Sequence, residues 1–296
     1  MSDLSNIVIG SAQFGMNYGI SNTNGKTNQK DINQILSAAI SMGIDCIDCA
    51  QAYGTAELAI GNALIQTKTS SKFKVITKIS PNLNPNDFEN ITSSIIKSKQ
   101  IVNQECLWGV MLHREEWLEY WDKGLKDCLI KLKKRGVIQH IGVSVYTTKY
   151  KDIICNDPDL ELIQIPHSIW HFQEERISFL ESLKLHSKKI FIRSIFIQGL
   201  LTMKSEQVKK MLPIAYNASR KWEEFINNKG ISKTEICIQY AKSLNEKIVI
   251  GLESKEQFDE NIEMYKINNI NHELFNGLKE KMQPFVSDKI IDPSKW

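Results

Sequence analysis

Short hydrophobic runs alternate with longer amphipathic segments along most of the chain. Eight of these runs are rich in Val, Ile and Leu and are mostly continuous rather than alternating, which is typical of parallel strands covered on both faces. They lie at Asn6–Ser11, Gly43–Cys49, Phe73–Ile79, Leu107–Leu112, His140–Val145, Leu160–Ile165, Lys189–Phe196 and Lys247–Leu252. The pattern therefore predicts eight parallel β-strands.

Three of the intervening segments carry apolar residues at helical spacing. They are Thr27–Met42, Trp117–Lys134 and Ser232–Leu244. The third begins with the pattern of a capping box, in which Ser232 and Glu235 each satisfy a free backbone amide. The stretch 202–230 is longer than one helix requires, so we expect an extra helix or a loop over the active site there.

Strands that alternate with helices imply a parallel sheet with right-handed crossovers. Eight such units match a closed (β/α)8 TIM barrel, whose usual size is about 250 residues, better than an open sheet. No linker, composition break or internal repeat divides the 296 residues. We therefore predict one (β/α)8 barrel domain over residues 1–296.

The composition excludes several classes of function. The chain has 37 basic and 34 acidic residues and a net charge of +3, with no dense basic tract, which argues against nucleic-acid binding. No apolar run approaches the ~20 residues needed to span a bilayer. The amino terminus lacks the pattern of a signal peptide, so we expect a cytoplasmic location and no membrane association.

Two of the six cysteines, Cys46 and Cys49, form a C-x-x-C pattern within the second predicted strand. Residues three apart on a strand point to opposite faces of the sheet. We therefore expect these thiols to diverge as reduced, buried side chains rather than to share a metal or a disulfide.

Ionisable side chains follow three neighbouring predicted strands. Asp48 ends the second strand and Tyr53 lies just beyond it, while Lys78 and His113 end the third and fourth strands. In barrels of this type, catalytic side chains sit at the carboxyl ends of the strands. Each residue alone has a structural interpretation, such as a boundary charge or a capping imidazole. Their arrival in order at adjacent strand ends favours one shared site.

The chemistry of this set suits carbonyl reduction. A phenol has an unperturbed pKa near ~10 and donates a proton poorly at neutral pH unless a nearby ammonium stabilises its phenolate. Tyr53 is then the proton donor, Lys78 lowers its pKa, and Asp48 anchors Lys78. His113 can donate a hydrogen bond that orients the substrate carbonyl.

These residues and several flanking motifs give the chain a resemblance to the aldo-keto reductase family. The matching positions run in order over nearly the whole chain: Gly10–Gly15, Asp48-x4-Tyr53-Gly54, Lys78, His113, Ile141–Ser144, Gln164–Pro166, Gly199–Leu201 and Gly251-x2-Ser254-x2-Gln257-x2-Glu260-Asn261. The resemblance implies a barrel that binds an extended nicotinamide cofactor and transfers a hydride directly to a carbonyl carbon while the tyrosine protonates the oxygen.

The same resemblance assigns a cofactor site. Ser144 and Gln164 would hold the carboxamide, and the adenosine end would be held by Ser254, Gln257, Glu260 and Asn261. The cofactor expected is NADP(H), with NAD(H) as the alternative. No G-x-G-x-x-G follows any predicted strand, which is consistent with binding outside a Rossmann fold.

Three departures from the family pattern bear on the cofactor. Val145 stands where asparagine usually follows the serine of the fifth strand. Arg193 occupies the position of an aromatic residue that often stacks on the nicotinamide, and a guanidinium is not equivalent to an aromatic ring there. Gly251 and Gln257 occupy positions that commonly bind the 2′-phosphate of NADP through basic side chains, for which Lys255 is a nearby substitute.

The segment after the sixth strand carries His167 and His171, four residues apart. Such a pair can chelate a metal on a helix, but Pro166 precedes it and no third ligand is evident, so no metal site is predicted. A loop over the site is expected instead. Trp170 in this loop and Trp296 near the carboxyl terminus are either pocket walls or packing residues.

The sequence thus predicts an NAD(P)H-dependent oxidoreductase that reduces a small aldehyde or ketone to an alcohol. A sugar-derived carbonyl compound is one candidate substrate. Two alternatives stay open. Val145 and Arg193 are also compatible with a barrel that binds the cofactor but acts as a non-catalytic regulatory subunit. An internal redox isomerase or epimerase, which recycles its bound cofactor, is the other.

Overall fold

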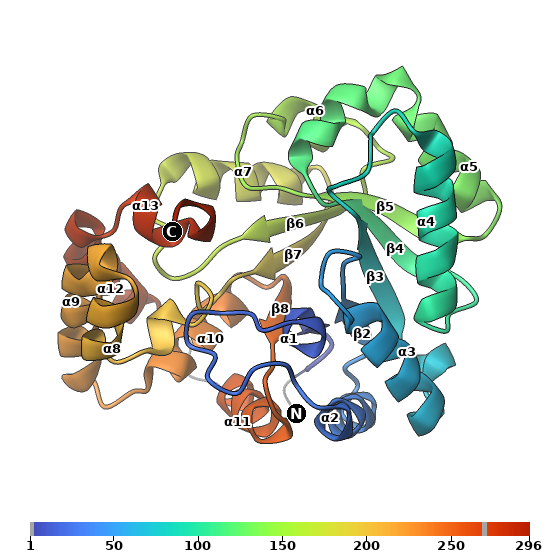
Figure 1. Ribbon diagram of the computed structural model, residues 1–296. Helices are drawn as coiled ribbons and strands as arrows, with labels where there is room; N and C mark the ends of the chain where they lie inside the picture. Colours follow the sequence, from blue (N-terminus) through green and yellow to red (C-terminus); the bar gives the residue numbers. More distant parts are fainter. Residues whose placement is uncertain (1–2, 268–270) are drawn as a thin grey trace.

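The eight predicted strands form a closed barrel in which every neighbouring pair is parallel and the strands follow one another in chain order (Figure 1). This computed structural model describes residues 3–267 and 271–296. The strands are β1 (Ile7–Gly10), β2 (Cys46–Asp48), β3 (Lys74–Ile79), β4 (Leu107–Leu112), β5 (Ile138–Ser144), β6 (Leu162–Pro166), β7 (Lys189–Arg193) and β8 (Lys247–Gly251). The predicted (β/α)8 fold is confirmed.

Helices follow the strands and surround the barrel. The α-helices that lie around the barrel are α2 (Gln29–Ser41), α3 (Ala56–Thr67), α4 (Phe88–Ile101), α5 (Leu125–Lys134), α6 (Lys151–Asn156), α7 (Glu174–Leu185), α10 (Lys233–Ser243) and α11 (Lys255–Lys266). The others are α1 (Ala12–Gly15), α8 (Ser205–Met211), α9 (Tyr216–Asn227), α12 (His272–Met282) and α13 (Asp288–Ile291). Short 3₁₀ helices span Ser70–Lys72, Glu115–Lys123, Leu200–Thr202, Pro213–Ala215, Gln283–Phe285 and Pro293–Lys295. In α10, Ser232 caps the first turn by accepting a hydrogen bond from the Glu235 amide at 3.0 Å.

The prediction of a single helix over Trp117–Lys134 is wrong. The segment contains a 3₁₀ helix that ends at Lys123 and the separate helix α5, which begins at Leu125. Gly124 lies between them with a φ of 112°, a left-handed conformation that an α-helix cannot contain. The apolar stripe continues through the break, so periodicity alone did not reveal it.

The seventh strand ends three residues earlier than predicted. Ser194, Ile197 and Gln198 have φ values of 60°, 48° and 53°. These left-handed conformations are costly for residues with a β-carbon and cannot continue a strand. The chain therefore turns away from the barrel directly after Arg193, into the loop that lines the cavity described below.

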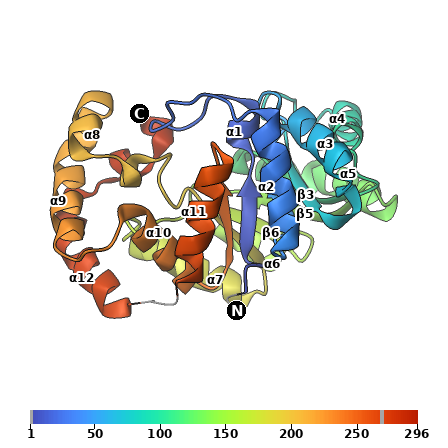
Figure 2. The same cartoon turned by 90° about the horizontal axis from the view of Figure 1, so that it is seen from below.

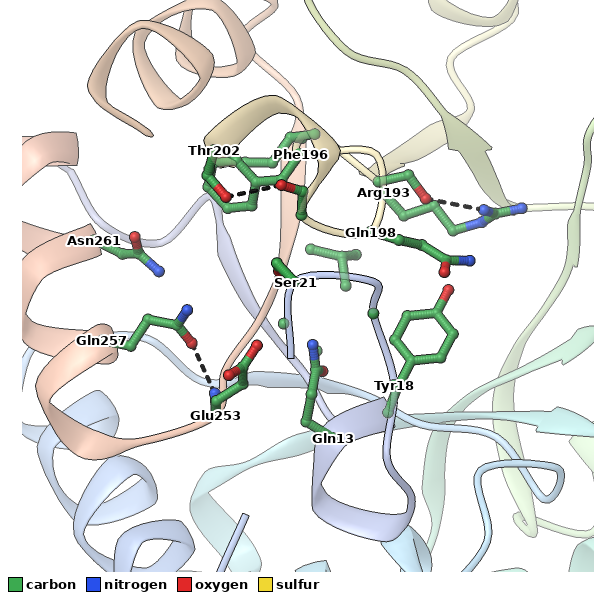
Figure 3. Close-up of a pocket in the computed structure, with 18 of the residues that line it drawn as sticks. Gln13, Tyr18, Ser21, Arg193, Phe196, Gln198, Thr202, Glu253, Gln257 and Asn261 are labelled. Atoms are coloured by element: carbon green, nitrogen blue, oxygen red, sulfur yellow. Dashed lines mark hydrogen bonds between the residues drawn. The ribbon is translucent and has the colours of Figure 1, made fainter. Parts of the chain in front are cut away.

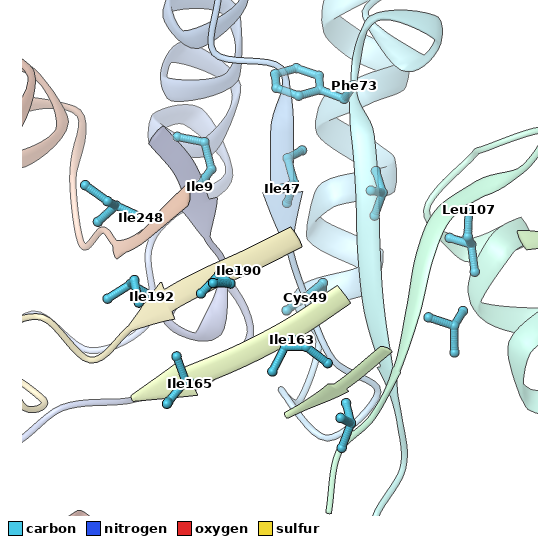
Figure 4. Close-up of a cluster of buried hydrophobic side chains, with 14 of the residues drawn as sticks. Ile9, Ile47, Cys49, Phe73, Leu107, Ile163, Ile165, Ile190, Ile192 and Ile248 are labelled. Carbon is cyan, nitrogen blue, oxygen red and sulfur yellow. The ribbon is translucent and has the colours of Figure 1, made fainter. Parts of the chain in front are cut away.

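The barrel separates two apolar layers. Alternate strand residues point inward, and the interior cluster consists of Val8, Cys46, Ile76, Met111, Leu162, Phe191 and Val249. The intervening residues, including Ile47 and Cys49, point outward and pack against the helices (Figure 4). Cys46 and Cys49 thus lie on opposite faces as predicted, both as free thiols. Burial raises the pKa of the Cys49 thiol to about 12, so it is protonated and unreactive.

A second apolar core lies outside the barrel. Helices α8, α9 and α12 pack together on one side of the molecule (Figures 1 and 2). Trp170 is fully buried in this core with its ring 6.1 Å from that of Trp222, and Trp296 packs against the same cluster. The packing interpretation of both predicted tryptophans is therefore correct. The stretch 202–230 supplies α8 and α9, which confirms the expected extra helix.

No helix within residues 3–267 or 271–296 is long and apolar enough to cross a membrane.

Candidate active site

Four ionisable side chains meet at the carboxyl ends of β2, β3 and β4. The Lys78 ammonium lies 2.6 Å from Oδ1 of Asp48, and both side chains are buried. The same ammonium donates to the backbone carbonyl of Cys49 at 3.0 Å and to the Tyr53 hydroxyl at 3.5 Å. His113 packs edge-on against Tyr53 with ring centroids 5.9 Å apart. The structure thus brings together the four residues that the sequence selected.

Burial dominates the electrostatics of Tyr53. It raises the pKa of the phenol well above 10, and the Asp48 carboxylate raises it further. The predicted lowering of the Tyr53 pKa is therefore not the net effect in this site, because burial is the largest contribution. Tyr53 is protonated at neutral pH and holds a proton that it can donate.

The His113 imidazole is neutral at neutral pH. Burial, followed by the positive charges of Lys78 and Arg193, lowers its pKa to about 3. Its Nδ1 atom is buried and has no hydrogen-bond partner. A neutral imidazole beside a phenol can orient a carbonyl oxygen through a hydrogen bond without giving up a full proton.

Gln164, predicted to hold a cofactor carboxamide, contacts the Asp48 and Lys78 pair. Its Nε2 donates to Oδ1 of Asp48 at 2.7 Å, the oxygen that also contacts Lys78. Its Oε1 is buried and has no partner, so an acceptor remains for an amide N–H. Ser144 is buried at the end of β5, directly opposite Gln164 in the strand register. Both residues have the chemistry to bind a carboxamide, but neither lines the cavity described next.

A cavity of about 200 Å³ lies above this cluster, with Asp48 and Tyr53 in its wall. It extends to the amino-terminal part of α11, where Gln257, Glu260 and Asn261 line it (Figure 3). The cavity therefore reaches from the phenol of Tyr53 to α11.

Two predicted cofactor residues take different positions. Ser254 does not line the cavity; its hydroxyl caps α11 by accepting from the Gln257 amide at 3.2 Å. Lys255 lies outside the cavity in a separate surface hollow, where its ammonium is bound to both carboxylate oxygens of Asp259. Gly251 lines the cavity beside the Gln13 side chain, whose Oε1 is buried without a partner.

The two residues that depart from the family pattern near the expected nicotinamide, Val145 and Arg193, lie in different surroundings. Val145 is fully buried in the apolar layer between the strands and the helices. Arg193 lines the cavity, and its guanidinium carbon lies 4.2 Å from the centre of the Tyr146 ring. Arg193 thus faces ligand space, whereas Val145 does not contact it.

The sequence did not identify the two loops that cover the cavity. Tyr18 and Ser21 come from the loop after α1, and Gln198 and Thr202 from the segment after β7. The backbone amide of Ile20 donates to the carbonyl of Gln198 at 3.0 Å, which joins the two loops. Glycines in both segments were a sequence signal for tight, closely packed loops. Gly19 and Gly199 have positive φ, and each lies against the opposite loop.

The histidine pair after β6 forms a buried hydrogen-bonded cluster. His167 Nε2 lies 3.0 Å from the Tyr240 hydroxyl, and His171 Nδ1 lies 2.8 Å from Ser168 Oγ. Among residues 3–267 and 271–296, no group of three or more His, Cys, Asp or Glu side chains is arranged to hold a metal. The two imidazole rings lie 5.4 Å apart, and neither histidine lines the cavity, so this segment is not the loop over the site that the sequence predicted.

A closed parallel barrel with a Tyr, Lys, Asp and His cluster at its carboxyl rim defines an oxidoreductase class. The model of the Aldo/keto reductase family matches residues 6–283, and the chain belongs to this family. A D-arabinose 1-dehydrogenase of Saccharomyces cerevisiae is 20% identical over 288 residues, which cover 88% of this chain and 84% of that protein.

Solved structures show the same fold. A glycerol dehydrogenase from Gluconobacter oxydans aligns with a TM-score of 0.74 and 19% identity, over 97% of this chain and 94% of that one. An aldo-keto reductase from Bacillus halodurans, in its holo form, aligns with a TM-score of 0.74 and 15% identity, over 98% and 95% of the two chains. The predicted family and the enzyme class, an aldo-keto reductase type oxidoreductase, are confirmed.

Proposed function

We propose that this protein interconverts a small, sugar-like aldehyde or ketone and its alcohol with a nicotinamide cofactor, and that Tyr53 is the proton donor in the direction of reduction. The observation that carries the proposal is the contact chain from Asp48 through Lys78 to the Tyr53 hydroxyl, at the wall of a cavity that reaches α11. The similarity to a D-arabinose 1-dehydrogenase supports a polyhydroxylated substrate.

In this mechanism, a bound nicotinamide supplies or accepts the hydride. Tyr53 gives its phenolic proton to the carbonyl oxygen of the substrate as the alcohol forms. Lys78, 3.5 Å from that hydroxyl, stabilises the resulting phenolate by its charge. Asp48 holds the ammonium in place through the buried ion pair, and the neutral His113 orients the carbonyl.

The cofactor site would use Gln164 and Ser144, neither of which lines the cavity itself, together with residues at the α11 end of the cavity. Gln164 Oε1, a buried acceptor without a partner, and the adjacent Ser144 suit the carboxamide. Gln257, Glu260 and Asn261 suit the adenosine end, because they line the cavity at α11.

We further propose that the cofactor is NAD(H) rather than the NADP(H) expected first. Two carboxylates, Glu253 and Glu260, line the α11 end of the cavity, and no Lys or Arg of the described residues lines it there. Lys255, the basic substitute suggested by the sequence, is occupied by Asp259. A 2′-phosphate would be repelled by the two acids, whereas a ribose 2′-hydroxyl can donate a hydrogen bond to one of them.

The test is a fluorescence titration of the protein with NADH and NADPH, followed by turnover with a panel of aldoses, ketoses and simple aldehydes. We expect tighter binding of NADH and a net loss of its absorbance with at least one carbonyl. Tight cofactor binding without turnover would favour a regulatory subunit. Conversion of substrate without any net absorbance change would favour an internal redox isomerase.

A further inference from the structure

Arg193 presents a positive charge to the cavity without a negative partner. It is the last residue of β7, and its side chain lines the cavity that also contains Tyr53 (Figure 3). Its Nη1 donates to the Ser194 hydroxyl at 3.2 Å, and its Nη2 is buried with no hydrogen-bond partner. A guanidinium carries five N–H donors, so several remain free for a ligand.

The nearby acid cannot neutralise this charge. Asp48 is the carboxylate closest to the reaction centre in the cavity wall, and both Lys78 and Gln164 occupy its Oδ1. No Asp or Glu within the described residues forms an ion pair with Arg193. A partly buried cation that lacks a partner is costly, and an anionic ligand would remove that cost.

The position of the guanidinium separates it from the adenosine end of the cavity. Arg193 gathers with Tyr18 and Gln198 at one end, and Gln257 and Asn261 lie at the other (Figure 3). Its charge acts on the phenols of Tyr18 and Tyr53 and on the imidazole of His113. Arg193 is thus part of the surroundings of the reacting carbonyl.

The Arg193 guanidinium is poorly suited to stacking on a nicotinamide ring. One face of the guanidinium is already covered by the Tyr146 ring, 4.2 Å away. The oxidised nicotinamide is itself a cation, so a guanidinium against it would be repelled. The donors in the guanidinium plane are the ones that remain, and these match the two oxygens of a carboxylate.

We propose that the substrate carries a carboxylate as well as a carbonyl, and that Arg193 binds this carboxylate while Tyr53 acts on the carbonyl. The inference rests on the proposed function. Tyr18 and Gln198 flank the guanidinium and can add a hydroxyl and an amide donor. A monoanion is favoured over a phosphate because Arg193 is the one unmatched cation that residues 3–267 and 271–296 present to this end of the cavity. Sugar acids and other short oxo acids have this chemistry.

The first test measures a preference with matched substrate pairs. Two pairs contrast a carboxylate with a neutral compound: succinate semialdehyde with butanal, and galacturonate with galactose. A third pair, glyceraldehyde 3-phosphate with glyceraldehyde, measures the preference for a phosphate. We expect the ratio of kcat/KM for carboxylate over neutral partner to exceed one in the wild type and to fall roughly 10- to 100-fold in Arg193→Met, the loss of one charge-assisted contact. Arg193→Lys should keep the charge but lose the paired donors, and so should give an intermediate ratio.

Arg220→Met is the matched control. Arg220→Met changes the net charge by the same amount as Arg193→Met. Arg220 lies on α9, half exposed and outside the cavity, so its replacement leaves the cavity intact. We expect it to leave the preference ratio as in the wild type. An Arg193→Met protein whose ratio equals that of the wild type would overturn the inference, and so would a larger preference for the phosphate than for the carboxylates.

The second test does not depend on turnover. Calorimetry would compare binding of butanoate and butanamide to the wild type and to Arg193→Met, each with NADH bound and without it. We expect tighter binding of the carboxylate, lost in the variant. Equal binding of acid and amide by the wild type would contradict the carboxylate site even if carbonyls are reduced. Selective carboxylate binding in a protein that reduces no carbonyl would instead contradict the proposed function.

Discussion

The ammonium of Lys78 lies 2.6 Å from the Asp48 carboxylate in a position where both side chains are almost completely shielded from water. The pair sits between the barrel interior and the Tyr53 hydroxyl, so one arrangement serves both the fold and the proposed chemistry. Removing one member of a buried pair leaves an unmatched charge, and this gives the pair a measurable role in stability.

We therefore expect Asp48→Ala to lower the free energy of unfolding by about 3–5 kcal/mol, the cost of breaking a buried ion pair. Urea denaturation provides the measurement. Asp45→Ala is the control, because Asp45 and Lys74 form a partly exposed pair at 2.7 Å, and such pairs contribute about 0–1 kcal/mol. Equal losses in the two variants would contradict the importance of burial at Asp48.

Tyr53→Phe should reduce kcat by a factor of about 10²–10⁴, the usual contribution of a general acid. Binding of NADH, measured by fluorescence, should change little, because only one hydroxyl at one end of the cavity is removed. Tyr216→Phe on α9 removes a hydroxyl that contacts Glu206 near the surface and should leave turnover unchanged. Full activity in the Tyr53 variant would rule out the proton-donor role.

A single charge change should alter cofactor choice. Glu260→Lys replaces an acid that lines the cavity at α11 by a base, and we expect the NADPH/NADH affinity ratio to rise by more than about tenfold. Glu263→Lys is the matched control, one turn further along the same helix and largely exposed to solvent. Should both variants shift the ratio equally, the effect would be one of net charge and not of the site.

The buried histidines should make the protein acid-sensitive. Burial lowers the pKa of His167 to about 4 and that of His171 well below 6.5. The unfolded chain binds protons at these residues below pH 6.5, whereas the folded protein does not, so stability falls as the pH drops from 6.5 toward 4. For His167 alone this loss is on the order of 3 kcal/mol.

Denaturation at a series of pH values tests this expectation. The slope of stability against pH between 6.5 and 4.5 should be smaller in His167→Gln than in the wild type. His186 is exposed at the end of α7, and His186→Gln should keep the wild-type slope. An unchanged slope in the His167 variant would show that other groups cause the acid sensitivity.

The contact between the two covering loops is also open to a test. A β-carbon on Gly199, where φ is 92°, would collide with Ser21, so Gly199→Ala should separate the loops and weaken NADH binding. Gly230 also has a positive φ, of 65°, but it faces open space. Gly230→Ala therefore carries the backbone strain of about 1–2 kcal/mol without the collision, and should leave NADH binding intact.

Local patterns in the chain determined the barrel and the cluster of ionisable side chains at its rim. Eight continuous apolar runs define strands buried on both faces, and parallel strands place their carboxyl ends on one rim. Asp48, Lys78 and His113 each lie at such an end, so their meeting follows from the strand order alone. The opposite orientation of Cys46 and Cys49 follows in the same way from the alternation of side chains along a strand.

Only the tertiary structure decided the electrostatic state of the site and the partners of its charged groups. The raised pKa of Tyr53, the capture of Lys255 by Asp259 and the unmatched guanidinium of Arg193 depend on which atoms lie nearby and how far water is excluded. Contacts such as that of Gln164 with Asp48 join residues more than a hundred positions apart. Periodicity and local motifs report the direction in which a side chain points, whereas its charge partners are set by packing between distant elements.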